Sequence, residues 1–242
     1  MKLIHWECLE EMDKLIAEWI KVDAIIADIP YWTTACKWDT IIPFEPMWER
    51  LNKLIKPNGA IVLFWSEPFS SALRMSNIKN YKYDWVWEKS KASNFLLAKK
   101  QPLKAHENII VFNSKIYYPQ KTEWTPFNKG KRKHTDWKAT DVYNKITNPD
   151  KLIINSNWLR NPRSVQYFKT AESEWKTYHW TQKPVALMEY LIKTYTQEWE
   201  TVLDFTAGSG STIVACQNTN RNWIWIELDE WYFKIMQERL NK

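Results

Sequence analysis

The feature that most constrains the fold is an alternation of short apolar runs with longer segments of helical spacing. Val22–Ala27 is a short apolar run that ends at Asp28, and Ala60–Trp65 is a second one. Between them, Phe44–Lys56 spaces its apolar residues as an amphipathic helix does, and Pro57-Asn58-Gly59 stops it. Apolar runs of this length between helices are typical of parallel strands buried on both faces.

The same alternation continues to the end of the chain, apart from one segment near the middle. We expect strands at 83–88, 107–112, 201–204 and 222–227, and helices at 67–79, at 184–195, from 211 and up to 240. This order predicts an α/β fold whose doubly wound, mostly parallel sheet carries helices on both faces. For 242 residues, one domain with an inserted region is the expected arrangement.

The segment 113–178 has a different character. It contains four prolines, little periodicity, and 13 Lys and Arg against 6 Asp and Glu, whereas the whole chain has a net charge of +6. The positive charge is therefore concentrated here, among aromatic residues that include Tyr117, Phe127 and Tyr143. A nucleic-acid surface needs cations for phosphates and flat rings for bases. A solvated, lysine-rich loop region is the alternative interpretation.

Composition argues against several other classes of protein. No segment approaches the roughly 20 apolar residues that a membrane span requires. The N-terminus reaches the charged Glu7 too early for a signal peptide. Cys8, Cys36 and Cys216 are widely spaced, so we expect reduced thiols in a cytoplasm, with neither a disulfide framework nor a metal site.

A glycine-containing loop follows the expected strand at 201–204. Gly208 and Gly210 allow a tight turn and a close approach of the backbone to a ligand, and the helix that follows offers free N–H groups. The next strand ends at Glu227, 23 residues after Asp204, where an acid can accept hydrogen bonds from ribose hydroxyls. The combination favours an adenosine-containing cofactor, although a Gly-x-Gly turn alone can be purely structural.

A second loop, Asp28-Ile29-Pro30-Tyr31, directly follows the first strand. The amino group of adenine is a poor nucleophile because its lone pair is delocalised into the ring. A carboxylate from Asp28 and a carbonyl from Ile29 could accept both N–H hydrogens and favour a localised lone pair. Pro30 stiffens the turn, and Tyr31 can stack on a base taken out of its duplex. The alternative is an ordinary turn at the end of a strand.

Together and in this order, these motifs resemble the β-class amino-methyltransferases of DNA, in which a (D/N/S)PP(Y/F) catalytic loop precedes the cofactor loop. Asp28-Ile29-Pro30-Tyr31 matches that loop, with Ile29 where proline is usual. His179–Pro184 is similar to the family's HPTQKP segment beside the methionine part of the cofactor, except at Trp180. His5–Cys8 fits the segment near the adenine ring, and His106–Ile109 fits the strand before the recognition region.

The resemblance covers nearly the whole chain and implies a Rossmann-like, seven-stranded sheet with an inserted target-recognition region. It divides the chain into a catalytic half (1–112), a basic recognition insertion (113–178) and a cofactor-binding half (179–242). It implies S-adenosylmethionine as cofactor and methyl transfer to a flipped base in duplex DNA. An aspartate at the head of the catalytic loop points to adenine N6, whereas a serine would have pointed to cytosine N4.

The resemblance also implies which residues form the site. The residues expected in catalysis are Asp28, Ile29, Pro30 and Tyr31. Those expected to hold the cofactor are Glu7, Cys8, Thr181, Lys183, Asp204, Phe205, Ala207, Gly208, Ser209, Gly210 and Glu227. Those expected to bind DNA are Lys129, Lys131, Arg132, Lys133, Arg160 and Arg163. The family leaves room for a homodimer and for a cognate restriction endonuclease, in a bacterial cytoplasm or that of a phage-infected host.

The chain departs from the family in its tryptophans. It has 4 glycines and 17 tryptophans, although glycine alone usually supplies about 7% of residues. Tryptophan stands where the family usually has glycine at Trp6, Trp32, Trp65, Trp199 and Trp225. We expect the fold to survive these rings and cofactor binding to be impaired by them, because several lie near strand ends where the ligand crevice should open.

Three other functions compete with adenine methylation of DNA. An RNA adenine methyltransferase would keep the chemistry and change the substrate. A catalytically impaired methyltransferase fold would act as a DNA-binding protein, which Trp32 and Trp65 favour. A nicotinamide-dependent oxidoreductase would need the full Gly-x-Gly-x-x-Gly and would leave the Asp28 loop unexplained.

Overall fold

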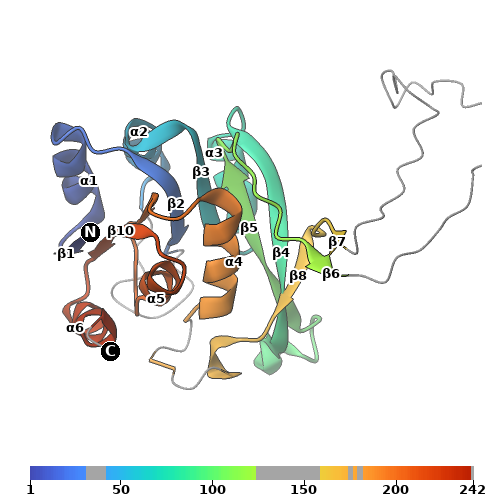
Figure 1. Ribbon diagram of the computed structural model, residues 1–242. Coiled ribbons are helices and arrows are strands. Elements are labelled where there is room, and N and C mark those ends of the chain that lie inside the picture. Colours follow the sequence, from blue (N-terminus) through green and yellow to red (C-terminus); the bar gives the residue numbers. More distant parts are fainter. Residues whose placement is uncertain (31–41, 124–158, 174–176, 179–181, 241–242) are drawn as a thin grey trace, which may run out of the picture. The chain divides into compact units, whose positions relative to one another are not determined.

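Eight strands form one sheet in the order β1-β10-β9-β2-β3-β5-β4-β8 (Figure 1). In the computed structural model we describe residues 1–30, 42–123, 159–173, 177–178 and 182–240. Neighbouring strands are parallel except where β5 pairs with β3 and β4. The strands are β1 (Lys2–His5), β2 (Val22–Asp28), β3 (Ile55–Trp65), β4 (Tyr81–Ser93), β5 (Lys104–Phe112), β8 (Val165–Phe168), β9 (Thr201–Asp204) and β10 (Asn222–Glu227).

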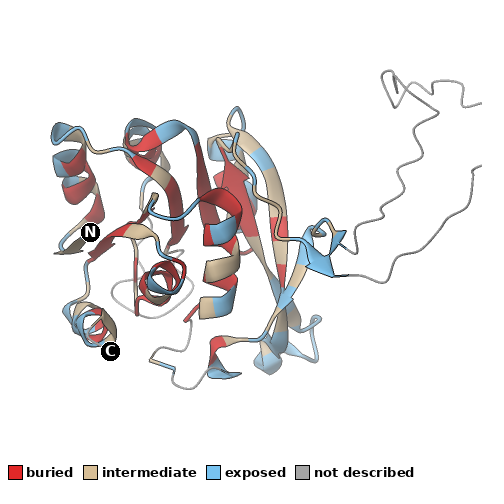
Figure 2. Ribbon diagram, in the orientation of Figure 1, coloured by how far each residue is buried: buried red, intermediate tan, exposed pale blue. Residues whose placement is uncertain are grey.

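Helices cover both faces of this sheet. One buried cluster joins the sheet to the first three helices, and a second joins its other face to the last three. Figure 2 shows the buried residues along the central strands and on the inner sides of the helices. The helices are α1 (Cys8–Ala17), α2 (Phe44–Leu54), α3 (Phe69–Ser76), α4 (Val185–Tyr195), α5 (Ser211–Asn218) and α6 (Glu230–Leu240), with 3₁₀ turns at Phe95–Leu97 and Ala171–Ser173.

The predicted doubly wound, mostly parallel sheet is thus confirmed, with one strand more than the seven expected. Neither β1 nor β8 is among the six strands expected from the residue pattern, and β8 pairs with β4 at the edge of the sheet although it lies within the range 113–178 expected as an insertion. Backbone contacts divide the chain into one unit of 1–118 with 163–242 and a second of 119–162. The second unit contains the short antiparallel pair β6 (Thr122–Glu123) and β7 (Leu159–Arg160).

No helix among the described residues is long and apolar enough to cross a membrane.

The order of the strands brings two distant loops together. β2 and β9 are parallel neighbours, with Ala24 opposite Val202 and Ile25 opposite Leu203. Parallel neighbours end at the same edge of a sheet, so the loop after Asp28 lies beside the loop after Asp204. A hydrogen bond of 3.2 Å from Thr206 Oγ1 to the carbonyl oxygen of Asp28 joins them.

Two tryptophans occupy backbone conformations that side chains other than glycine rarely adopt. Trp19 has φ +58° just after α1, where its N–H donates to the Ile16 carbonyl and the next N–H, from Ile20, reaches back to Leu15. This pair of bonds is the Schellman motif, whose left-handed position is usually glycine. Trp199 has φ +68° in a turn closed by the Glu200 N–H and the Gln197 carbonyl. Its place is the third of a type II turn, which also favours glycine.

We expect Trp19→Gly to raise the free energy of unfolding by roughly 0.5–1 kcal/mol. Relief of a left-handed conformation that costs an L-residue about 1–2 kcal/mol outweighs the greater freedom of glycine in the unfolded chain. Trp19 is 88% exposed, so losing its ring removes little packing. Urea unfolding measures the change. Trp19→Ala is the matched control, because it removes the ring but keeps Cβ; an equal gain in both variants would contradict the backbone explanation.

Candidate active site

Asp28 lies at the carboxyl end of β2, and its two carboxylate oxygens have different surroundings. Oδ2 accepts a hydrogen bond of 2.5 Å from Lys183 Nζ. Oδ1 is buried and has no hydrogen-bond partner among the described residues. The next residue, Ile29, is 2% exposed and packs in the core, which orients this end of the loop. One oxygen is therefore anchored, and the other is left to accept a hydrogen bond.

Lys183 is the centre of a buried group of charges. Its Nζ also lies 3.4 Å from Glu107 Oε2 and 5.4 Å from the centroid of the Phe64 ring. Glu107, within β5, forms a second ion pair with Lys89 of β4. Strand pairing accounts for the arrangement, because Glu107 lies opposite Trp87 in the β4–β5 register and β5 borders β3. Two lysines and two carboxylates thus balance each other where their side chains are largely buried.

These neighbours act on the two carboxyl groups in opposite ways. Burial, with a contribution from Glu107, raises the pKa of Asp28 although Lys183 acts to lower it. Burial also opposes ionisation of Glu107, but Lys183 and Lys89 together hold the pKa of Glu107 below its ordinary value. The Asp28 carboxylate is therefore the more easily protonated of the two, and Lys183 limits how far its pKa rises.

The loop after β9 is tied down on one side and open on the other. The Gly208 N–H donates to Glu227 Oε2 at 2.6 Å, and the Asp229 N–H donates to Oε1 at 2.8 Å. Gly208 has φ +54°, and a Cβ there would meet no atom of the described residues within 4 Å. Gly210 has φ +80°, and a Cβ there would approach Met236 Cγ to 2.9 Å. The open space beside Gly208 is the kind of cradle that a ligand can occupy.

Asp204 holds the start of this loop through two hydrogen bonds. Thr212 Oγ1 donates to its Oδ2 at 2.6 Å, and the Thr206 N–H donates to its Oδ1 at 3.1 Å. The side chain is buried, which raises the pKa of Asp204 to about 7 despite these two donors. The next residue, Phe205, is 1% exposed and packs in the core. Asp204 and Phe205 therefore shape the loop, while Gly208 and Glu227 border its open side.

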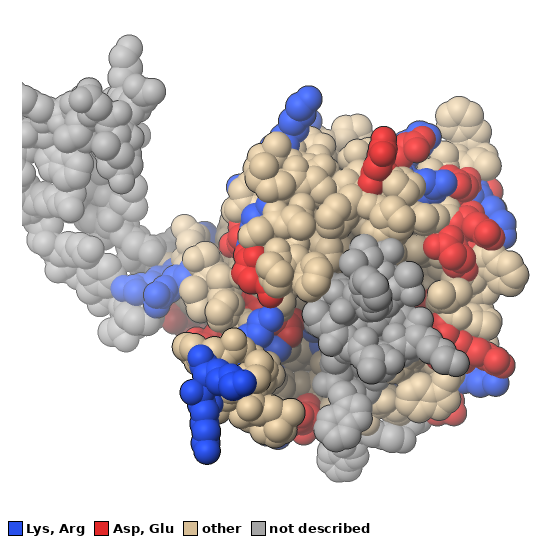
Figure 3. All heavy atoms as spheres, turned by 180° about the vertical axis from the view of Figure 1, so that it is seen from behind, with Lys and Arg blue, Asp and Glu red and all other residues tan. Residues whose placement is uncertain are grey.

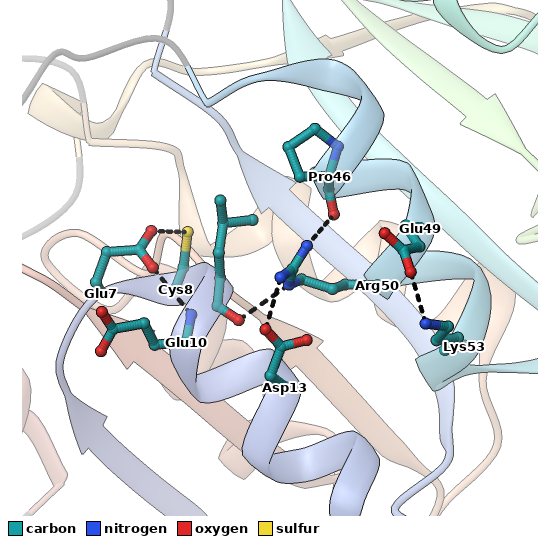
Figure 4. A network of polar contacts seen from close by, with 9 residues as sticks. Glu7, Cys8, Glu10, Asp13, Pro46, Glu49, Arg50 and Lys53 are labelled. Atoms are coloured by element: carbon teal, nitrogen blue, oxygen red, sulfur yellow. Dashed lines mark hydrogen bonds and ion pairs between the residues drawn. The ribbon is translucent and has the colours of Figure 1, made fainter.

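Glu7 and Cys8 follow β1 and lie beside the end of β10. The Trp6 N–H donates to the Glu227 carbonyl, which joins the two strand ends. Glu7 caps α1, because its Oε2 accepts a hydrogen bond of 2.9 Å from the Glu10 N–H (Figure 4). The other carboxylate oxygen of Glu7, Oε1, lies 3.4 Å from Cys8 Sγ. Burial raises the pKa of the Cys8 thiol, so it is not a reactive thiolate.

A second helix supports α1 through one arginine. Arg50 of α2 donates to the Leu9 carbonyl at 3.1 Å, to the Pro46 carbonyl at 2.9 Å and to Asp13 at 2.6 Å (Figure 4). These contacts fix α1 against α2, and with it the position of the residues that begin α1.

Gln182 contacts the glycine-containing loop, a role that the sequence did not reveal. Its Oε1 accepts from the Tyr178 N–H at 3.0 Å and from Ser209 Oγ at 3.3 Å. Its Nε2 is buried and has no hydrogen-bond partner in the part of the chain that the structure describes. Glu107 and Lys89 were also missed. Their sequence neighbourhood predicts a strand, whereas their ion pairs depend on which strands are adjacent.

The structure brings most of the predicted site residues together. Four segments converge at one edge of the sheet through the bonds given above. They are the segment that ends at Asp28, the one that contains Lys183, the loop after Asp204 and the strand that ends at Glu227. Arg160 lies half-buried on β7 in the second unit, and Arg163 is exposed in the first. Pro30 is half-buried. The predictions for Tyr31, Trp32, Lys129, Lys131, Arg132, Lys133 and Thr181 lie outside the described residues.

Two of the unusual tryptophans are packed into the core. Trp65 is 2% exposed and lies against Phe44 and Phe69, with ring centroids 5.4 and 5.8 Å away. Trp225 is fully buried and stacks on Trp223 at 5.7 Å. Both rings therefore belong to the hydrophobic clusters on the two faces of the sheet.

Within the described residues, no group of three or more His, Cys, Asp or Glu side chains could hold a metal ion.

Comparison with known proteins identifies one family. A family model described as DNA methylase, of the N6 and N4 type, matches residues 22–238. The type II methyltransferase M2.LlaDCHI of Lactococcus lactis subsp. cremoris is 26% identical over 99% of this chain and 89% of its own length. The type II methyltransferase M2.DpnII of Streptococcus pneumoniae has the same identity and the same two coverages.

Solved structures share the fold. The M1.HpyAVI complex with S-adenosylmethionine superposes with a TM-score of 0.65 at 27% identity, covering 98% of each chain. The cytosine-N4-specific PvuII DNA methyltransferase has a TM-score of 0.64 at 16% identity, covering 97% of this chain and 84% of its own.

Proposed function

We propose, from the premise that the chain belongs to the N6/N4 DNA methylase family, that it methylates adenine N6 in duplex DNA by base flipping. It is a DNA methyltransferase that uses S-adenosylmethionine. The aspartate at the head of the catalytic loop, where a serine would point to cytosine N4, supports the choice of adenine. One observation supports its role as the acceptor for an exocyclic amine. Beside the glycine-containing loop, the buried Oδ1 of Asp28 has no hydrogen-bond partner in the described residues, while Lys183 holds Oδ2.

The residues around the loop fit the cofactor. The open space beside Gly208 admits a ligand close to the backbone. Each oxygen of Glu227 accepts one backbone N–H and keeps a lone pair that can accept from a ribose hydroxyl. Bound there, S-adenosylmethionine supplies an electrophilic methyl group on its sulfonium. The residues that we propose to hold it are Glu7, Cys8, Thr181, Lys183, Asp204, Phe205, Ala207, Gly208, Ser209, Gly210 and Glu227.

The Asp28 loop would prepare the target amine. Oδ1 of Asp28 accepts one N–H of the adenine amino group, and the carbonyl of Ile29 accepts the other. Both acceptors localise the lone pair on nitrogen, and an Asp28 that is already held cannot turn away, so catalysis comes from positioning and electrostatics. Pro30 restricts the turn, and Tyr31 stacks on the flipped base. Lys183 keeps Asp28 ionised and oriented.

Sequencing of modified bases tests the choice of base. The chain is expressed in a host that lacks DNA methylation, and its DNA is sequenced with N6-methyladenine and N4-methylcytosine distinguished. We expect N6-methyladenine in one short sequence context. N4-methylcytosine would overturn the adenine assignment but leave the family unchanged. Methylated RNA with unmodified DNA would support an RNA methyltransferase.

We further propose that the basic segment contributes DNA contacts through Lys129, Lys131, Arg132, Lys133, Arg160 and Arg163. A homodimer, a cognate restriction endonuclease and a cytoplasmic location stay predictions. Light scattering would test for the homodimer, and the neighbouring genes would show whether an endonuclease is encoded beside this chain. Cell fractionation would test the location.

Asp28→Ala should lower the rate of methyl transfer by orders of magnitude while DNA affinity stays within a few-fold. This pattern marks an interaction made mainly in the transition state. Single-turnover transfer and a DNA-binding titration measure the two quantities. Glu238→Ala, which removes an exposed carboxylate from α6, is the matched control and should behave as the parent chain. Retained transfer in Asp28→Ala would remove the proposed role.

The acidic limb of the pH profile of kcat should report the charge on Asp28. The carboxylate must be ionised to accept the amine, so activity falls as the pH drops through its raised pKa. Lys183→Met removes the cation that lowers this pKa, so the limb should move to higher pH. Glu107→Gln removes an anion that raises it, so the limb should move to lower pH. Saturating S-adenosylmethionine excludes effects on cofactor binding. Shifts in the same direction would contradict this account.

A further inference from the structure

The turn between β4 and β5 exposes a continuous group of large apolar side chains. The strands pair up to Ser93 and Lys104, and the chain between them begins at Asn94 with φ +71° and forms a short 3₁₀ helix. In that helix Phe95 is 74% exposed and Leu96 85%. Leu97 and Leu103 are also exposed. Single exposed apolar residues are common, but a group of them at the end of a hairpin marks a contact surface.

Cations surround this apolar tip. Between residues 89 and 106 the chain has five lysines and no Asp or Glu. Lys89 and Lys91 form ion pairs with Glu107 and Glu172. Lys99 and Lys100, directly after the apolar residues, are exposed. Figure 3 shows Lys and Arg side chains standing out from the lower end of the molecule. Exposed lysines beside an apolar tip fit a polyanion that also offers flat apolar surfaces.

The tip also extends from the edge of the sheet where the catalytic loop lies. Asp28 pairs with Phe64, and the next residue on that strand, Trp65, pairs with Asn108 of β5. Glu107 shares Lys183 with Asp28, and from Glu107 toward the N-terminus β5 runs directly into the hairpin turn. DNA whose target base reaches Asp28 would therefore pass close to this turn.

We infer that this turn, residues 94–103, is a DNA-contacting wedge: Phe95 and Leu96 enter the duplex beside the flipped base, and Lys99 and Lys100 contact phosphates. Apolar side chains that insert between base steps stabilise an unstacked duplex, and lysines supply affinity without reading sequence. The inference rests on the proposed function, because it requires duplex DNA with a flipped base.

The test uses the sequence context found by modified-base sequencing, in a duplex with 2-aminopurine at the target position. Phe95→Ala/Leu96→Ala should bind DNA within a few-fold of the parent chain, with a reduced 2-aminopurine signal and methyl transfer slowed by about tenfold or more. A mismatched target base, which is already easier to flip, should restore much of that loss. A merely structural role would not be rescued in this way.

Lys99→Gln/Lys100→Gln should instead weaken binding to all sequences and reduce the slope of log affinity against log salt by roughly 1.8. The controls, Met75→Ala/Ile78→Ala and Lys79→Gln/Lys82→Gln, change exposed residues just before β4 or at its start, at the opposite edge of the sheet. They should match the parent chain.

The failures are distinguishable. If the parent chain methylates no DNA, the proposed function fails. A second outcome is that the parent chain methylates DNA while Phe95→Ala/Leu96→Ala gives the same 2-aminopurine signal and the same rate of methyl transfer. That result overturns the proposed wedge. A parent dimer that this variant converts to monomers would also overturn it, since a second copy of the chain would then be the occupant.

A second inference rests on the tryptophans. Trp19 and Trp199 occupy the left-handed positions of a Schellman motif and a type II turn. Within the described ranges, the other non-glycine residues with positive φ are asparagines, which tolerate it. Trp225 is fully buried, and its Nε1 has no hydrogen-bond partner among the described residues. By contrast, the indole N–H groups of Trp48 and Trp85 donate to Ser76 Oγ and Tyr195 Oη.

The structure thus separates two kinds of tryptophan position, one that suits the indole and one that suits glycine. UGA is read as tryptophan in some genetic codes and as glycine in others. We infer that the gene is read with UGA as glycine, so that the protein made in its own cell has glycine at positions 19, 199 and 225. The scarcity of glycine in the chain, 4 in 242 residues, has the same explanation.

The codons of the gene test this directly. We expect UGA at positions 19, 199 and 225, and UGG at positions 48 and 85. Peptide masses of the protein purified from its source cells should then show glycine at the first three positions and tryptophan at the other two. UGG codons at positions 19 and 199, or tryptophan masses there, would overturn the inference.

Discussion

The parallel pairing of β2 with β9 is the constraint on which the rest of the site depends. From β2 the chain crosses through α2 to β3 on one side, and from β9 it crosses through α5 to β10 on the other. The connections diverge, so a crevice opens at the carboxyl ends of the two strands, which is where open α/β sheets bind ligands. Asp28 and the loop after Asp204, far apart in sequence, become neighbours only because these two strands are adjacent.

Lys183 orients the Asp28 carboxylate at this edge of the sheet. A carboxylate buried alone would be protonated at higher pH or would turn toward water, and either change would remove the acceptor that the proposed reaction needs. One ammonium group holds Asp28 on one oxygen and leaves the other without a partner among the described residues. Glu107 balances the charge of Lys183, and Lys89 balances that of Glu107. Removing one member of such a buried group lowers the free energy of unfolding by about 3–5 kcal/mol. The residues that would support the proposed reaction therefore also stabilise the fold.

Local preference and global fold agree over most of this chain, and the exceptions have meaning. Strand patterns, helix ends and turns point to the same architecture, as expected of a natural sequence. The disagreements are of two kinds. The tip of the β4–β5 hairpin exposes large apolar side chains to solvent at the edge of the sheet where Asp28 lies. A contact with DNA would cover these side chains. The tryptophans at left-handed positions violate backbone preference far from that edge, where nothing compensates, which is why we assign them to the decoding of the gene.

The sequence by itself determined the alternation of strands and helices, the doubly wound sheet and the two loops of the site. These follow from local causes: apolar periodicity, glycine at positive φ, and acids directly after strands. It also predicted Glu227 as a site residue, from its place at the end of a strand, and Lys183, by resemblance. The pairing of Lys183 with Asp28, the roles of Glu107, Lys89 and Gln182, and the joining of β8 to the sheet were decided only by the tertiary structure. Each depends on which strands are neighbours and in what register, and that is settled by packing between segments far apart in the chain.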